Sequence, residues 1–466
     1  MANQLVRAIL GCGKLKVVQS SMDELIQDDI NLLVGVHERY IMRVPNGKMM
    51  SLNMKRARGL DLAGRKLAYA QFVGAQLDNS NFSGTDLTRA NFFGASLIGC
   101  NFSGANLTEA DLRGAIMQRT NFSATILTAA NLGDGVLLCQ GASGDLIPAH
   151  QHDPEMRFSA ATFRNASAER ANLAQGISVA SDLSHANFRD AKLQGANFSG
   201  SDLHGAIFTG ADLSGCDFSN ANLSGTTLRG AILDGTKFDG ADLTSCLIGA
   251  GQHEQGNFSR AKLPRSIGDL DKSIQVIIAS HELWVRSLAR EGQRANLARV
   301  DLSEAMLDGV QFEAANFSQA LLVRTSFRRT VFTMADLGGA NLNASLLAHS
   351  DCRGVNFSKS VLAHADMHNV DCSAMSIQTG LNMMRWPANF SGANLEQARL
   401  EEGDFRGADF TGAIMTKCDL RRANFEGAAL VDADLTGADL RGANLEGADL
   451  RGVAGLKHDG GYRTGS

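Results

Sequence analysis

The stretch SDLHGAIFTGADLSGCDFSNANLSG, residues 201–225, repeats itself every five residues. A large apolar residue recurs at Leu203, Phe208 and Leu213, and a small residue stands two positions before each of them. Asp or Asn usually precedes the large residue, and Gly often stands two positions after it. A period of five matches neither the 3.6 residues of a helical turn nor the two-residue alternation of a strand. The period is therefore a unit of architecture.

The pattern continues over most of residues 52–456 and resembles the pentapeptide-repeat family, whose consensus is A(D/N)LXX. The resemblance implies an all-β solenoid, a right-handed quadrilateral β-helix in which each pentapeptide forms one side and four form a coil. The large and small apolar residues would then face the axis. Asp, Asn and Gly suit the corners because they favour turns. Neighbouring coils would be spaced like paired strands, about 4.8 Å apart.

The spacing of phenylalanines gives a direct test of this architecture. Phe82, Phe102 and Phe122 are twenty residues apart, as are Phe72 and Phe92, and the two sets are offset by ten. Twenty residues return the chain to the same side of the square, so each set should stack in a column on one of two opposite sides. The five prolines lie outside the regular repeats, which agrees with the exclusion of proline from interior strands.

Three interruptions divide the repeats. The first, CQGASGDLIPAHQHDPEM, is polar and carries two prolines, so we predict a loop insertion at 138–160. The phase of the large residue slips by one position across this insertion. The third lies at 378–389, around GLNMMRWPAN, and predicts either an apolar bulge packed on the coil or an exposed contact patch. The contact candidates there are Met383, Met384 and Trp386.

The second interruption carries apolar residues spaced by four, three, four and three, the spacing of an amphipathic helix. The same spacing occurs 244 residues earlier, near the N-terminus. The pairs are Ile26 and Leu270, Ile30 and Ile274, Leu33 and Ile277, His37 and His281, and Tyr40 and Trp284. We interpret the correspondence as a duplication of a helical cap followed by a β-helix, because the end of a β-helix exposes unpaired backbone. On this interpretation His37 and His281 are packed, hydrogen-bonded histidines rather than catalytic ones.

The predicted organisation is two tandem β-helices, each with an N-terminal α-helical cap. The parts are an N-terminal segment and cap at 1–50, a first β-helix at 51–263, a linker and second cap at 264–294, a second β-helix at 295–456 and a flexible tail at 457–466. The C-terminal end has no evident cap, and either the polar, Gly-rich tail covers it or a second chain pairs with it; an end-to-end homodimer is a hypothesis.

Composition bounds the chemistry of the chain. Cys100, Cys216, Cys246 and Cys418 occupy the small inward position, and Cys352 and Cys372 the large one, so we expect core thiols in a reducing compartment. The absence of a CxxC pair argues against zinc, and we predict no metal or cofactor. No apolar run approaches the roughly eighteen residues of a membrane span. These features favour a cytoplasmic, bacterial protein.

The polar first loop and the acidic C-terminal repeats supply the other candidate residues. In the loop, a surface segment is a better interpretation than a metal site because no ligand spacing is present. His364 and His368 are four apart but would occupy different sides of the coil. From residue 390 to 456 there are twelve acidic and seven basic residues. The candidates are Asp145, His150, His152 and Asp153 in the loop, and Asp432, Asp434, Asp439 and Asp449 in the acidic block.

Three functions remain open from the sequence. The favoured one is a non-enzymatic interaction module that presents rigid faces and loops to a protein partner, because solenoids bind through extended surfaces. The second is a DNA mimic, which the resemblance suggests because some family members bind DNA gyrase through DNA-like shape and charge; direct nucleic-acid binding is not expected. The third is a secreted or membrane-associated effector. No nucleophile–base set, phosphate loop or carboxylate pair predicts an enzyme.

Overall fold

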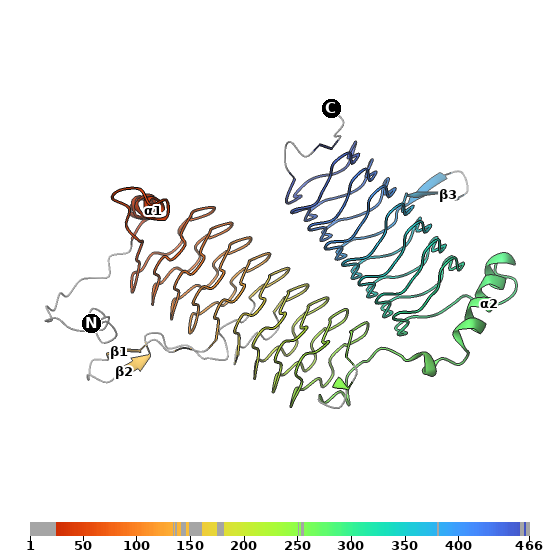
Figure 1. Cartoon of the computed structure of the whole chain (residues 1–466), viewed down its shortest axis with the longest axis horizontal. Coiled ribbons are helices and arrows are strands. Elements are labelled where there is room, and N and C mark those ends of the chain that lie inside the picture. Colours follow the sequence, from red (N-terminus) through yellow and green to blue (C-terminus); the bar gives the residue numbers. More distant parts are fainter. Residues whose placement is uncertain are drawn as a thin grey trace. The chain divides into compact units, whose positions relative to one another are not determined.

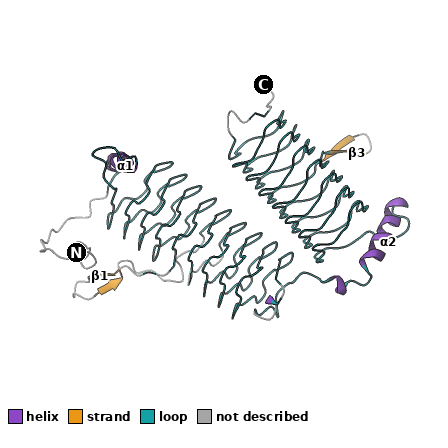
Figure 2. Ribbon diagram, viewed as in Figure 1, coloured by secondary structure: helices purple, strands orange, loops and turns teal. Residues whose placement is uncertain are grey.

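The structure is a computed structural model of the whole chain. It describes residues 25–133, 135, 138–140, 146–148, 161–174, 181–249, 251–252, 256–379, 382–456 and 461–462. In chain order the elements are α1 (Gln27–Ile41), β1 (Leu138–Gln140), β2 (Leu146–Pro148), the 3₁₀ helix η3 (Ile267–Asp269), α2 (Ile274–Arg286), β3 (Met375–Thr379) and β4 (Asn382–Trp386). Stacked coils make up most of the rest, as Figures 1 and 2 show.

Each coil has four sides of five residues, and each side pairs with the side twenty residues later. Asp61, Asn81, Asn101 and Asn121 form one such series of parallel bridges. A β-turn closes each corner, as where the Lys55 N–H donates to the Leu52 carbonyl over 2.9 Å. The third residue of that turn, Met54, has φ 56°. Gly occupies this position so often because it enters the left-handed region without steric cost.

Phenylalanine columns fill the axis of the first set of coils. The ring centroids of Phe82 and Phe102 are 4.7 Å apart and those of Phe102 and Phe122 are 5.3 Å apart, with nearly parallel planes. Phe72 and Phe92 stack at 4.6 Å on the other side, and Phe72 meets Phe82 edge-on at 6.1 Å. The prediction of two opposed columns is therefore confirmed. Offset stacking and edge contacts are the favoured aromatic arrangements.

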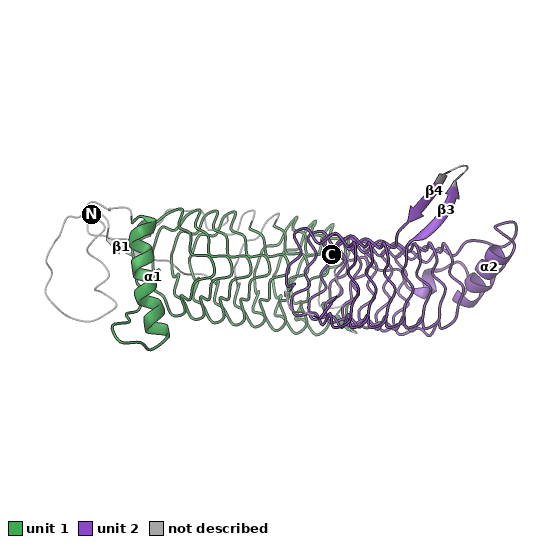
Figure 3. Ribbon diagram, turned by 90° about the horizontal axis from the view of Figure 1, so that it is seen from above, with its two compact units in different colours: residues 1–223, 227–242, 248–261 green, residues 224–226, 243–247, 262–466 purple. Residues whose placement is uncertain are grey.

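The chain divides into two compact units, coloured separately in Figure 3. The first comprises residues 1–223, 227–242 and 248–261, and the second comprises 224–226, 243–247 and 262–466. Helix α1 precedes the coils of the first unit, and α2 lies in the second unit before the coils that follow residue 294.

Two insertions interrupt the stacking without ending it. Asn121 bridges Thr162, 41 residues later instead of twenty, so 21 extra residues leave the coil there. This number explains the slip of one position in the five-residue phase. The backbone of β1 and β2 forms an antiparallel hairpin within this insertion. Asn356 bridges Asn389, 33 residues later, so thirteen extra residues leave the second unit, and they include most of the hairpin of β3 and β4.

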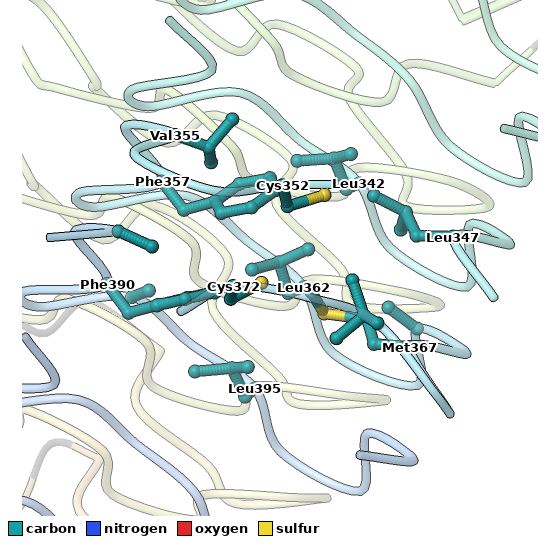
Figure 4. Packing of buried hydrophobic residues seen from close by; sticks show 14 of the residues in the cluster. Leu342, Leu347, Cys352, Val355, Phe357, Leu362, Met367, Cys372, Phe390 and Leu395 are labelled. Carbon is teal, nitrogen blue, oxygen red and sulfur yellow. The ribbon is translucent and has the colours of Figure 1, made fainter. Parts of the chain in front are cut away.

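Cysteines complete the core, as expected for thiols at inward positions. The six cysteines that the sequence placed at inward positions, Cys100, Cys216, Cys246, Cys352, Cys372 and Cys418, are buried and free. Cys352 and Cys372 lie on neighbouring coils, among the aliphatic and aromatic side chains that Figure 4 shows. Burial raises the pKa of the Cys372 thiol well above its ordinary value, so the thiolate that reacts with oxidants is scarce.

Candidate interaction surfaces

The hairpin of β3 and β4 is an amphipathic element that leaves the coils of the second unit (Figure 3). Its cross-strand partners are Met375 with Trp386, Ser376 with Arg385, Ile377 with Met384, and Gln378 with Met383. Because side chains alternate between the two faces of a strand, one face carries Met375, Ile377, Met384 and Trp386. The opposite face carries Ser376, Gln378, Met383 and Arg385. The hairpin therefore has an apolar face and a mainly polar face.

The foot of this hairpin is anchored at two glycine corners of the coil. The Trp386 Nε1–H donates to the Gly354 carbonyl over 3.1 Å. A Cβ at Gly354, where φ is 66°, would come within 2.8 Å of the Trp386 ring. On the other side, a Cβ at Gly407 would come within 3.1 Å of the Arg385 guanidinium. Gly at both corners thus lets the two side chains lie close to the backbone.

The three sequence candidates in this hairpin are exposed in spite of that anchor. Met383 is 65% exposed, Met384 is 50% exposed and Trp386 is 44% exposed. Of the two arrangements left open by the sequence, the structure shows features of each, since Trp386 contacts the coil while both methionines face outward. Whether they bind a partner stays a prediction.

The acidic C-terminal block is largely paired with arginine. Asp439 accepts the Arg441 Nε–H over 2.8 Å, and Asp449 accepts the Arg451 Nε–H over 2.9 Å, each in a two-bonded arrangement. The hydrogen bonds from Arg441 and Arg451 lower the pKa of the two carboxyl groups. The pairing follows from the Asp-x-Arg spacing, which places both side chains on one side of a coil.

The other two acidic candidates, Asp432 and Asp434, are not paired with an arginine of the described residues in the same way. Asp434 accepts the backbone N–H of Thr436 over 2.9 Å and thereby supports a corner. Asp432 is exposed and adopts φ 57° at the third residue of its turn. Of the four candidates, two are thus held in ion pairs and one in a turn, and the net negative charge available to a partner is smaller than the sequence count suggests.

Further arginines neutralise the same block. Glu401 lies 3.2 Å from Arg399 on its own coil, and 3.3 Å from Arg421 and 2.8 Å from Arg422 on the next coil, so one carboxylate contacts three guanidinium groups. The Arg421 Nη also lies 2.6 Å from Asp419. Such exposed pairs are individually worth little, but together they make this surface one of mixed charge.

The candidates in the first loop, Asp145, His150, His152 and Asp153, lie outside the described residues. Within the part of the chain that the structure describes, no group of three or more His, Cys, Asp or Glu side chains is placed to hold a metal ion.

Histidine pairs form across coils at a spacing that the sequence reasoning did not consider. His368 does not meet His364; its ring lies 4.9 Å from that of His349 on the preceding coil, and its Nδ1 is 2.6 Å from Asp366. A second pair, His185 and His204, has centroids 5.1 Å apart. Both pairs are nineteen residues apart, one less than a full coil, and a search at that spacing would have found them.

The helices α1 and α2 each place a buried histidine on the first coil that follows. The Met50 N–H donates to His37 Nδ1 over 2.9 Å, and the Ala295 N–H donates to His281 Nδ1 over 3.0 Å. The acceptor role leaves Nδ1 unprotonated, so each neutral ring carries its proton on Nε2. Burial lowers the pKa of both histidines. The expectation of packed, hydrogen-bonded histidines agrees with this geometry.

The repeats match the family model described as pentapeptide repeats. The matched stretches together span residues 58–134, 181–247, 295–371 and 388–453, more than half of the chain. The chain belongs to the pentapeptide-repeat family. Its coils are therefore those of the right-handed quadrilateral β-helix of this family. No curated protein matches the chain.

Several solved structures resemble parts of this pentapeptide-repeat protein. Full-length QnrB1, a plasmid-mediated fluoroquinolone resistance protein, is 24% identical over 39% of this chain and 92% of its own, with a TM-score of 0.19. HetL from the cyanobacterium Nostoc, described as involved in heterocyst differentiation regulation, is 18% identical over 91% of this chain and 96% of its own, with a TM-score of 0.16. Rfr23 from the cyanobacterium Cyanothece is 20% identical over 35% of this chain and 91% of its own, with a TM-score of 0.10. TM-scores this low carry no argument about function.

The sequence contains no apolar run long enough for a membrane span. Among the described residues, neither α1 nor α2 has the length and apolar character that crossing a bilayer demands.

Proposed function

We propose that this chain is a non-enzymatic interaction module that presents the hairpin of β3 and β4 to a protein partner. The observation that carries the proposal is the half-exposed apolar face of Met384 and Trp386 on an element anchored to the coil at Gly354. An exposed tryptophan and methionines on a fixed support are typical of protein contact sites. The stacked coils beneath supply the support, because each side is paired with its neighbours.

Affinity capture with the full chain tests this proposal. The bait is compared with a Met384→Asp variant, which places a charge on the apolar face, and with Met306→Asp as the matched control, since Met306 is 73% exposed on the coils. A partner retained by the wild-type chain and by Met306→Asp, lost by Met384→Asp, and bound again when purified supports the proposal. Equal retention by all three baits contradicts it.

We also propose that α1 and α2 are the caps of two tandem β-helices. The support is that His37 and His281 accept backbone N–H groups from the first coil that follows each helix. Those donors would otherwise be left unsatisfied at the end of a solenoid.

A homodimer through the last coil of the second β-helix is part of the same proposal. Within the coils, the Phe425 N–H donates to the Asn444 carbonyl and the Leu430 N–H to the Asp449 carbonyl. The equivalent N–H groups of Leu445 and Leu450, on the last coil, have no partner among the described residues. Light scattering that shows a monomer up to high protein concentration contradicts this dimer.

The DNA-mimic hypothesis, with DNA gyrase as partner, ranks second. It requires a row of available carboxylates for charge complementarity. The pairing of Asp439 with Arg441 and of Asp449 with Arg451 reduces that charge. A supercoiling assay decides this point, because absence of any effect on gyrase at micromolar protein excludes the hypothesis. Cytoplasmic location remains part of the proposal, on the ground of the free buried thiols.

A further inference from the structure

The strands β3 and β4 form a sheet with two open edges. They pair only with each other in the sheet, and among the described residues neither of them pairs with a third strand. Within the described parts of the chain, no backbone hydrogen bond joins residues 375–377 or 383–386 to the coil, and the contact at the foot is the hydrogen bond from the Trp386 side chain to the Gly354 carbonyl. An open edge offers unpaired N–H and C=O groups to another extended chain.

Arg385 on this edge differs from the arginines near the foot of the hairpin. Arg353 is held by Asp351, with Nε 2.8 Å from the carboxylate, and Arg406 is held by Asp404 at 2.9 Å. Arg385 is exposed, and within the described residues it has no ion pair and no side-chain hydrogen bond. A cation fixed over Gly407 without a carboxylate is therefore available to a partner.

We propose that an extended segment of a partner protein, with acidic residues alternating with apolar ones, adds to the edge of β4 as a third strand. This inference rests on the proposed function and names the kind of partner. A strand beside β4 would place its apolar side chains next to Met384 and Trp386 on one face. Its acidic side chain between them would lie next to Arg385 on the other face, because side chains alternate along both strands. Backbone pairing supplies affinity and the alternating side chains supply selectivity.

A second copy of this hairpin does not meet these requirements. The residues of the two strands, MSIQT and NMMRW, include no Asp or Glu. Pairing of two such hairpins would therefore leave each Arg385 without a carboxylate from the other strand.

Peptide probes test the inference on the full chain. The first probe is a fluorescently labelled eight-residue peptide of alternating valine and glutamate. The second replaces glutamate with lysine, and the third has the composition of the first with valines and glutamates in two blocks. Fluorescence anisotropy should show binding of the first probe alone to the wild-type chain. Arg385→Glu should weaken that binding about tenfold and should allow binding of the lysine probe. Arg329→Glu, the same charge change at an exposed corner of the coil, should leave binding of the first probe unchanged.

Each outcome of this experiment is informative. Equal binding of the alternating and block glutamate probes, or equal loss with Arg385→Glu and Arg329→Glu, overturns strand addition in favour of unspecific charge attraction. Self-association of the chain that Arg385→Glu abolishes overturns it in favour of a second copy, and binding to neutral lipid vesicles without peptide binding overturns it in favour of a membrane. If a captured partner depends on Met384 while no probe binds, the strand-addition inference fails and the proposed function stands.

Discussion

The helices α1 and α2 each contact the segment that follows them through a buried histidine, but the surroundings of the two histidines differ. Each buries one histidine whose Nδ1 accepts a backbone N–H. His37 has Tyr40 as its aromatic neighbour, with centroids 5.9 Å apart and tilted planes. His281 lies between two aromatic rings, stacked at 5.6 Å on Trp284 and at 6.1 Å on Phe312. The shared element is the hydrogen bond, and the packing around it varies.

Aromatic contacts are more extensive around α2, whereas polar contacts are more extensive around α1. In α1, Glu38 pairs with Arg65 at 3.0 Å, and the Gln27 side chain both accepts from the Asp61 N–H and donates to the Asp61 carbonyl. Around α2 the corresponding polar link to the following segment is the bond from Lys272 to Gln293, over 3.3 Å. Helix α1 therefore docks through the fully buried side chains of Ile30 and Val34 together with these polar contacts, whereas α2 buries only His281 completely and docks through aromatic stacking. The lesson is that a buried histidine acceptor is the requirement that both ends share.

The largest expected effect comes from removing either histidine. His281→Ala and His37→Ala each leave a buried N–H without an acceptor and create a cavity, with an expected local destabilisation of about 3 kcal/mol. Hydrogen–deuterium exchange of the first coils after each helix measures it. His281→Asn restores an acceptor oxygen and should recover part of the protection. Unchanged exchange in both alanine variants would show that the histidines do not hold the helices.

Acidification should weaken both helices together. Burial lowers the folded-state pKa of His37 and His281 below the ordinary value of 6.5. The unfolded state therefore binds more protons, so the stabilisation is complete above about pH 6.5 and is lost as pH falls toward the folded pKa values. Protonation of Nδ1 also removes the acceptor. Protection of the first coils, measured relative to the intrinsic exchange rate at each pH, should fall between pH 7.5 and pH 5.5, and after α2 it should fall more in the wild type than in His281→Asn.

Substitution of the aromatic neighbours of the two histidines should destabilise α2 more than α1. Trp284→Leu removes the stacking on His281 and should cost about 1 kcal/mol of local stability. Tyr40→Leu removes only a tilted contact in α1 and should cost less. The same exchange measurement compares the two variants, and a larger effect from Tyr40→Leu would reverse the assignment of aromatic docking to α2.

The smallest effect concerns the ion pair that joins Glu38 of α1 to Arg65 of the coil, whereas the pair of Glu282 with Arg286 lies within α2. Glu38→Gln should destabilise α1 by about 0.5 kcal/mol, because Arg65 is well exposed and its pair with Glu38 is screened by solvent. The effect should shrink as salt is raised. Thermal unfolding of the wild type and of Glu38→Gln at low and high salt tests this, with Glu282→Gln in α2 as the control. Equal salt dependence in both helices would contradict the polar docking of α1.

Features that depend on a regular spacing along the chain could be predicted from the sequence, whereas contacts between particular side chains of different coils or strands could not. The stacking of Phe82, Phe102 and Phe122 followed from spacing alone, because a coil of twenty residues returns each ring to the same column. The pairing of Asp439 with Arg441 was also within reach, since the two lie on one side of one coil, yet the acidic count concealed it. The two faces of the hairpin required the cross-strand partners, and the contact of His349 with His368 required a coil-to-coil spacing of nineteen.

The amino-acid sequence by itself determined the coiled architecture of this protein, its aromatic columns and the places where the repeats stop. It could do so because a five-residue period repeats the same short-range turn and inward side chains dozens of times. Only the tertiary structure decided which carboxylates are neutralised, how Trp386 is anchored at Gly354, and that Arg385 pairs with no carboxylate of the described residues. These features depend on side chains that meet across coils and across a hairpin, and such contacts arise only once the chain is folded.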